Sequence, residues 1–149
     1  MKKFLLPLLL IVCLLAACAP KESPAAELTA TVTIDCLPLL DSPELVSEKT
    51  LPLIPDNHIF SEKEISFSQG TSAYDVLIRV MQEDKLHYEA DSSKYIFAIG
   101  NIYSGDCGSM SGWLYEVNGE SPMVGAKDYV LSDGDHVRMY YTAEMVWDD

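Results

Sequence analysis

Hydrophobic residues follow two periodicities in different segments of this chain, one typical of strands and one typical of a helix. Together these patterns restrict the fold that the chain can adopt. Apolar and polar residues alternate over residues 30–36, 113–117 and 137–141, which predicts three strands with one buried face each. Shorter apolar segments at residues 65–67 and 95–99 predict two more strands. The main part of the chain is therefore expected to form a sheet.

One segment has helical spacing instead. Ser72 and Asp75 have the S-x-x-D spacing of a capping box, which predicts the start of a helix. The following apolar residues recur three and four positions apart: Ala73, Val76, Leu77, Val80 and Met81. They would form one buried stripe over about three turns. The element order predicts an α+β, β-grasp-like fold, with one main helix packed on a mixed or antiparallel sheet of about five strands.

The remaining segments contain turn and loop signals. Four prolines interrupt residues 37–58, which we expect to be irregular apart from one helical turn near residues 44–47. Asn118-Gly119 directly follows a predicted strand and favours a hairpin turn. Residues 132–135 predict another turn before the last strand.

The amino terminus has the order of a bacterial lipoprotein signal. Lys2 and Lys3 precede an apolar run over residues 4–15, which is shorter than the ~20 residues that a membrane-spanning helix needs. The run ends in Leu15-Ala16-Ala17-Cys18, which resembles a lipobox. An ordinary secretory signal with an A-x-A-like site is the alternative. We expect cleavage before Cys18 and a diacylglycerol anchor on its thiol, whose fatty-acid chains (palmitate) hold the protein in the membrane.

The expected cleavage and lipidation divide the chain into three parts. Residues 1–17 are the expected signal peptide, and residues 18–28 are the lipidated cysteine with a proline-containing tether. Residues 29–149 form the expected domain. The protein would lie outside the cytoplasm, anchored to the bacterial cell membrane.

Charge and motif content exclude several functions. The formal net charge of −13 comes from 23 acidic and 10 basic side chains, so the chain lacks the basic surface that nucleic-acid binding needs. The three histidines are scattered and none has a metal-ligand spacing. No nucleophile elbow or phosphate loop occurs. We therefore expect a protein that is not an enzyme and requires no metal or cofactor.

Two cysteines are left once the signal is removed and Cys18 is acylated. In an exported protein, Cys36 and Cys107 predict one disulfide between the first strand and the loop before residue 113. Cys107 as a reactive thiol is the less favoured alternative.

Several motifs together resemble one family. They are Ser72-Ala73-Tyr74-Asp75-Val76-Leu77, Tyr103-Ser104-Gly105-Asp106-Cys107-Gly108, Gly112-Trp113-Leu114-Tyr115-Glu116-Val117-Asn118-Gly119 and Leu131-Ser132-Asp133-Gly134-Asp135. Over residues 32–142 the chain resembles the transcobalamin-like C-terminal domain of bacterial surface proteins, a domain of unknown function. The resemblance implies a β-grasp-like fold. It also implies a relation to the animal cobalamin carriers, whose equivalent small domain closes over the corrinoid.

Aromatic side chains in these motifs are the candidate ligand contacts. Tyr103, Trp113 and Tyr115 can stack on a flat ligand, and Asn118 would shape the adjacent turn. Alternatively, Trp113 and Tyr115 are only the buried face of a strand. The favoured function is a surface binding module for a corrinoid or other small planar ligand, which it could present to an importer. The alternative is a structural or adhesive module that contacts a protein or a glycan.

The lipid anchor gives the first testable prediction. Wild-type protein is expected to incorporate a labelled fatty acid and to sediment with membranes, whereas Cys18→Ser should do neither. Continued labelling and sedimentation of Cys18→Ser would contradict the assignment.

Overall fold

The computed structural model describes residues 27–144, which contain one α-helix, three short 3-10 helices and two sheets. The larger sheet has the order β2-β1-β7-β6 and the smaller has the order β3-β4-β5. The four strands of the larger sheet are β1 (Leu28–Asp35), β2 (Ile59–Phe67), β6 (Gly112–Val117) and β7 (Asp135–Thr142). The smaller sheet consists of β3 (Tyr88–Ala90), β4 (Ile96–Ile99) and β5 (Ile102–Tyr103).

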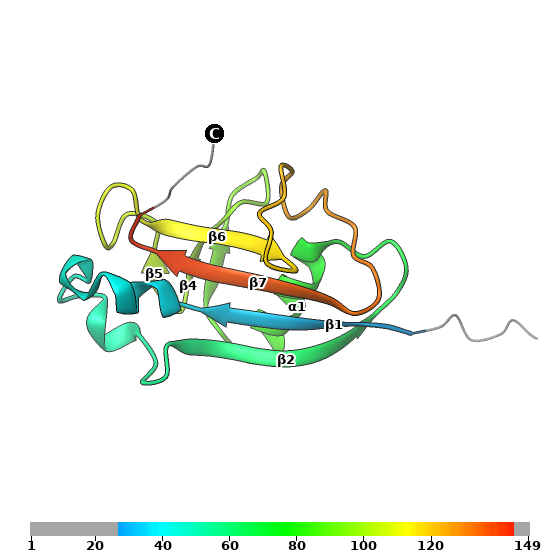
Figure 1. The fold of residues 1–149 in the computed structure, drawn as a ribbon, viewed down its shortest axis with the longest axis horizontal. Coiled ribbons are helices and arrows are strands. Elements are labelled where there is room, and N and C mark those ends of the chain that lie inside the picture. Colours follow the sequence, from blue (N-terminus) through cyan, green and yellow to red (C-terminus); the bar gives the residue numbers. More distant parts are fainter. Residues whose placement is uncertain (1–26, 145–149) are drawn as a thin grey trace, which may run out of the picture.

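The first and last strands of the domain lie side by side at the centre of the larger sheet. β1 and β7 pair in parallel, with Val32 opposite Val137, and each also pairs antiparallel with an outer strand. Figure 1 shows β7 between β1 and β6, so the last strand of the chain fills the gap between two earlier strands. The central pair therefore joins segments about a hundred residues apart, Thr33 and His136 among them.

Helix α1 (Ala73–Glu83) covers one face of this sheet. The Ser72 hydroxyl accepts a hydrogen bond from the Asp75 N–H, and the Asp75 carboxylate accepts one from the Ser72 N–H, so the predicted capping box is confirmed. All five residues of the predicted apolar stripe are buried. They pack with Val32, Ile34 and the inward side chains of β7 to form the core.

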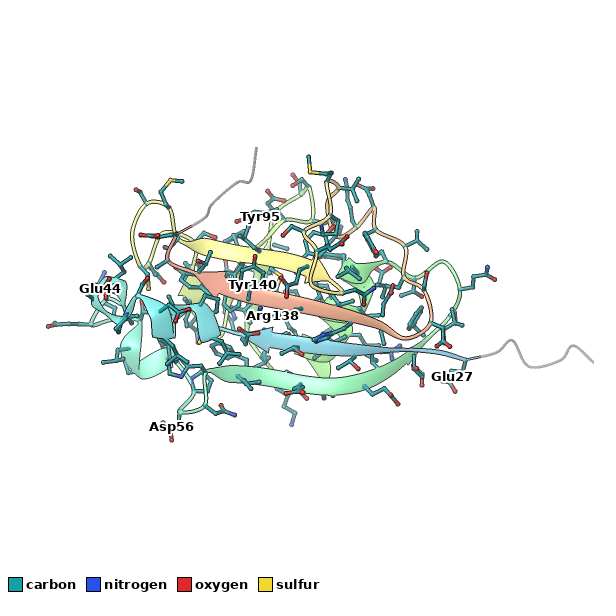
Figure 2. All side chains as sticks on the ribbon, in the orientation of Figure 1. Glu27, Glu44, Asp56, Tyr95, Arg138 and Tyr140 are labelled. Carbon is teal, nitrogen blue, oxygen red and sulfur yellow. The ribbon has the colours of Figure 1, made fainter. Side chains whose placement is uncertain are left out.

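The opposite face of the larger sheet holds a buried ion pair. Arg138 donates two hydrogen bonds to the fully buried Asp35, with Nε–Oδ2 at 2.6 Å and Nη2–Oδ1 at 2.9 Å. Its Nη1 also lies 3.3 Å from Glu116 Oε1. Figure 2 shows Arg138 and Tyr140 on this face of the sheet, away from α1. The hydrogen bonds with Asp35 raise the pKa of Arg138, so the charge is held at the β1–β7 junction.

Several sequence predictions need correction. The α+β class is confirmed, but the described residues form seven strands in two sheets rather than about five in one. β3 and β5 have three and two residues, which is too short for an alternating pattern. β2 is longer than residues 65–67, and β1 begins at Leu28, the last residue assigned to the tether. The β-grasp assignment stays a prediction.

The proline-containing segment folds into three short 3-10 helices rather than one helical turn. They are η1 (Leu37–Asp41), η2 (Pro43–Leu45) and η3 (Leu51–Leu53), and each has a proline at its first or second position. The predicted signal peptide and Cys18 lie outside the described residues. Within residues 27–144, α1 is the only α-helix, and no helix has the length and apolarity to cross a membrane.

The Arg138–Asp35 pair gives a stability prediction. Arg138→Met leaves the Asp35 carboxylate buried without its partner, so the free energy of unfolding should fall by about 3 kcal/mol. Urea denaturation measures this change. As a control, Arg79→Met removes an exposed i,i+4 pair with Glu83 and an exposed hydrogen bond to the Ser66 carbonyl, and should cost less than about 1 kcal/mol. Equal losses in the two variants would contradict the assignment.

Candidate functional site

A groove of about 840 Å³ lies beside β6, the edge strand of the larger sheet. This volume is within the ~300–1,000 Å³ typical of small-molecule sites. One wall is the segment 93–96, and another is the loop 119–127 that follows β6. The groove is larger than a second cavity of about 320 Å³ that lies near Leu45 and Cys107.

The open edge of β6 forms the floor of this groove. Trp113 and Tyr115 point toward the α1 side of the sheet, whereas Leu114 and Tyr140 point to the opposite side, and all four line the groove. A cavity that collects side chains from both faces of a sheet must straddle the edge between them. The groove therefore runs along the open edge of β6.

The strand register identifies the main-chain groups on this edge. The Asn118 N–H donates to the His136 carbonyl, which sets Glu116 and Leu114 as the residues hydrogen-bonded to β7. The alternate residues of β6, Trp113, Tyr115 and Val117, direct their N–H and C=O groups away from β7. Those of Val117 are taken by Glu120, at 2.9 and 3.1 Å. Those of Trp113 point the same way, but this residue is fully buried, so Tyr115 is left as the residue whose main-chain groups can hydrogen-bond a ligand in the groove.

Apolar and aromatic side chains make up much of the groove's exposed lining. Tyr95 is 44% exposed, Val124 is 48% exposed and Met123 is fully exposed. Lys94 and Lys127 are the basic residues of the lining and Glu120 is the acidic one. This composition suits a flat, largely apolar molecule with a few polar groups at its rim.

Trp113 and Tyr115 both line the groove, but hydrogen bonds within the protein hold their side chains in place. Trp113 is fully buried, donates from Nε1 to the Ile102 carbonyl and packs edge-on against Tyr141 at a centroid distance of 5.2 Å. The Tyr115 hydroxyl donates to the Val124 carbonyl and so holds the groove loop. Burial raises the pKa of Tyr115 to about 12, so its hydroxyl stays protonated at neutral pH.

Tyr103 and Asn118 lie outside the groove lining. The Tyr103 hydroxyl donates to Glu89, and this bond, more than the one from His87, lowers the pKa of that carboxyl. Asn118 adopts a positive φ of 56°, and its side chain binds Asp135 and the His136 N–H, each at 2.9 Å. The predicted turn at Asn118-Gly119 forms. The antiparallel pairing directly across this turn is limited to the Val117–Glu120 bridge, and β6 pairs with β7 only after the groove loop. Ligand contact by the four predicted residues stays a prediction.

Sequence reasoning missed the groove loop and Tyr95. The signal was present in Pro122-Met123-Val124-Gly125, where two large apolar residues lie between loop-forming residues. Apolar side chains in such a loop have no strand or helix face to bury them. Their exposure next to an open sheet edge is typical of a binding surface.

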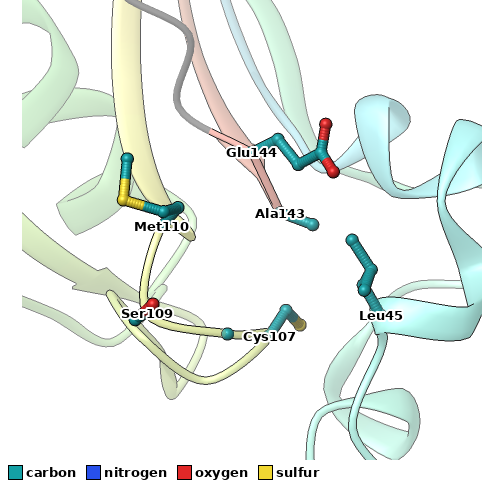
Figure 3. A pocket seen from close by; sticks show the side chains of 7 residues that line it. Leu45, Cys107, Ser109, Met110, Ala143 and Glu144 are labelled. Carbon is teal, nitrogen blue, oxygen red and sulfur yellow. The ribbon is translucent and has the colours of Figure 1, made fainter.

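The two cysteines are free, buried thiols in the structure. The Cys36 Sγ–H donates to the His58 carbonyl at 3.5 Å. Burial raises the pKa of Cys36 to about 12, and the neighbouring Asp35 and Cys107 add to this effect. Cys107 also lines the smaller cavity of about 320 Å³, beside Leu45 and Met110 (Figure 3). The predicted disulfide is thus not formed here and stays a prediction.

Comparison with known proteins confirms the family resemblance. The model of a domain of unknown function (DUF4430) matches residues 70–143, a shorter span than residues 32–142. No curated protein matches the chain.

Two solved structures are similar to this chain, and the first of them shows a fold relationship. One is haptocorrin in complex with Cbi, with a TM-score of 0.57 and 12% identity over 83% of this chain. The chain spans only 27% of haptocorrin's length, so the likeness concerns one part of that protein. The other is a candidate metal-binding protein from Ruminococcus gnavus, with a TM-score of 0.45 and 15% identity over 78% of this chain and 97% of that one.

The cysteine pair gives a prediction for the exported protein. Cys36 is protonated at neutral pH, so air oxidation should be slow and closure should need a thiol oxidant of the export compartment. Protein recovered from that compartment should not react with iodoacetamide when unfolded without reductant, and should take up two adducts after reduction. Mass spectrometry of the mature domain counts the adducts.

Loss of this disulfide would affect stability. On the chain-entropy model, a disulfide that closes the long loop between Cys36 and Cys107 stabilises the fold by about 4 kcal/mol, because it restricts the unfolded chain. Cys36→Ser, Cys107→Ser and the double variant should therefore lose similar amounts. Two alkylated thiols in the unreduced exported protein would contradict the prediction.

Proposed function

We propose that this protein is a non-enzymatic binding module, held outside the cell membrane by a lipid on Cys18, that takes a small planar ligand in the groove beside β6. A corrinoid is the ligand class that we favour. The observation that carries the proposal is the groove of about 840 Å³, which combines exposed aromatic and apolar side chains with the open edge of β6.

The groove suits a flat ring with polar arms. Tyr95, Met123 and Val124 offer apolar surface to the face of a ring. The main-chain N–H and C=O of Tyr115 offer a donor and an acceptor at the floor, where an amide arm of a corrinoid could pair with them.

The fold relationship supports the same ligand class. The haptocorrin structure is a complex with a corrinoid, and this chain resembles part of it. At 12% identity the likeness concerns the fold alone, so the ligand of this chain has to be identified by experiment. An anchored domain with such a groove would concentrate the ligand at the cell surface and pass it to an importer.

Absorbance titration tests the proposal. The purified mature protein is titrated with cobinamide and, separately, with cobalamin, and binding should shift the corrinoid spectrum with saturation at one ligand per chain. Tyr95→Ala and Met123→Ala should each weaken binding about tenfold, because each removes contact area from the groove. Their melting temperatures should not change, since Tyr95 is 44% exposed and Met123 is fully exposed.

A matched control uses a methionine elsewhere. Met110 is 52% exposed but lines the smaller cavity, so Met110→Ala should leave corrinoid affinity unchanged. No spectral shift with either corrinoid would reject that ligand class. Equal weakening in Met110→Ala and Met123→Ala would reject the groove as the site.

A further inference from the structure

A second apolar surface lies at the end of the sheet where β1 runs into the 3-10 helices. Four leucines of this segment are unusually exposed: Leu40 (56%), Leu45 (37%), Leu51 (64%) and Leu53 (36%). Leu45 and the exposed Met110 line the smaller cavity of about 320 Å³ between the 3-10 helices and the loop 105–110. Figure 3 shows Leu45 and Met110 on opposite sides of this cavity, with Cys107 between them. We call this surface the leucine end; it consists of η1, η2, η3 and Met110.

The leucine end lies away from the expected anchor. β1 begins at Leu28, next to the tether, and its eight residues carry the chain roughly 26 Å before η1 starts. Figure 1 shows the 3-10 helices and the start of β1 at opposite ends of the molecule. A domain tethered at the start of β1 would therefore present its leucine end outward.

The leucine end has an acidic rim. Its exposed carboxylates are Asp41, Glu44, Glu48, Asp56 and Glu144, whereas Lys49 is the one exposed basic residue of this segment among the described residues. Figure 2 shows Glu44 and Asp56 projecting from this end. An apolar centre with a charged rim of one sign is typical of a surface that selects a partner of opposite charge.

We propose that the leucine end is the docking surface for a folded protein whose contact face has an apolar centre and a rim of Lys and Arg. One apolar side chain of this partner enters the cavity between Leu45 and Met110. The exposed leucines cover its apolar centre, and the carboxylates pair with its basic rim. The surface shares no lining residue with the groove, so both can be occupied together.

The charges argue against two other occupants. A second copy of this chain would bring two acidic rims together, which costs free energy in any symmetric contact. A membrane surface with anionic lipids would repel the same carboxylates. A basic protein partner gains from both the leucines and the carboxylates.

Site-specific photo-crosslinking in the native cells tests the proposal. The full-length protein carries either Leu51→benzoylphenylalanine or, as a matched control, Val130→benzoylphenylalanine; these residues are 64% and 60% exposed. The partner captured through position 51 is then purified and titrated against the wild type, Leu51→Glu and Val130→Glu. We expect at least a tenfold loss of affinity for Leu51→Glu and none for Val130→Glu. Wild-type affinity should also fall as salt is raised, because the rim pairs are screened.

Any one of three results would overturn the proposal. No adduct specific to position 51 is formed, or Leu51→Glu keeps its affinity at an equal melting temperature, or the affinity does not depend on salt. A concentration-dependent dimer in sedimentation that Leu51→Glu abolishes would assign the surface to a second copy. A new position-51 adduct that appears only when the chain is ended at Glu144 would assign it to residues 145–149.

Discussion

The packing of Trp113 between the two sheets is the contact on which the rest of the structure depends. Its indole N–H is bound by the Ile102 carbonyl of the smaller sheet, and its ring packs against Tyr141 of the larger one. Tyr141 reaches in the same direction, since its hydroxyl donates to the Tyr103 carbonyl at 2.8 Å. Burial raises the pKa of Tyr141 to about 12, so this hydroxyl remains a donor at neutral pH. Two strand residues thus fix the angle between the sheets.

This junction also explains the position of the groove. Because Trp113 ties the start of β6 to β5, the segment 93–96 stands opposite the open edge of β6 rather than pairing with it. The loop 119–127 closes the other side, held by Tyr115 and Val124. The residues that make the cavity possible are therefore mostly buried, and those suited to contact a ligand are the exposed residues of the two walls.

Sequence reasoning succeeded where structure follows from neighbours in the chain. The Ser72–Asp75 box and the apolar stripe of α1 are local features, and both are confirmed. The second sheet, the long β2 and the groove loop could not be predicted, because they depend on contacts between distant segments. Asn118-Gly119 shows the boundary: both residues take the positive φ that the dipeptide favours, yet the next strand starts only at Asp135. The motif determines the turn but not what pairs after it.

The central place of β7 has a consequence for the order in which this chain can fold. A chain that emerges amino terminus first completes β1, β2, α1 and β6 while the gap between β1 and β6 is still empty. Both strands then expose unpaired edges, and neither Asp35 nor the Trp113 ring has its partner on β7. The sheet closes in one late, long-range step, which slows folding. Until that step the two open edges of β1 and β6 are places where another strand could mispair.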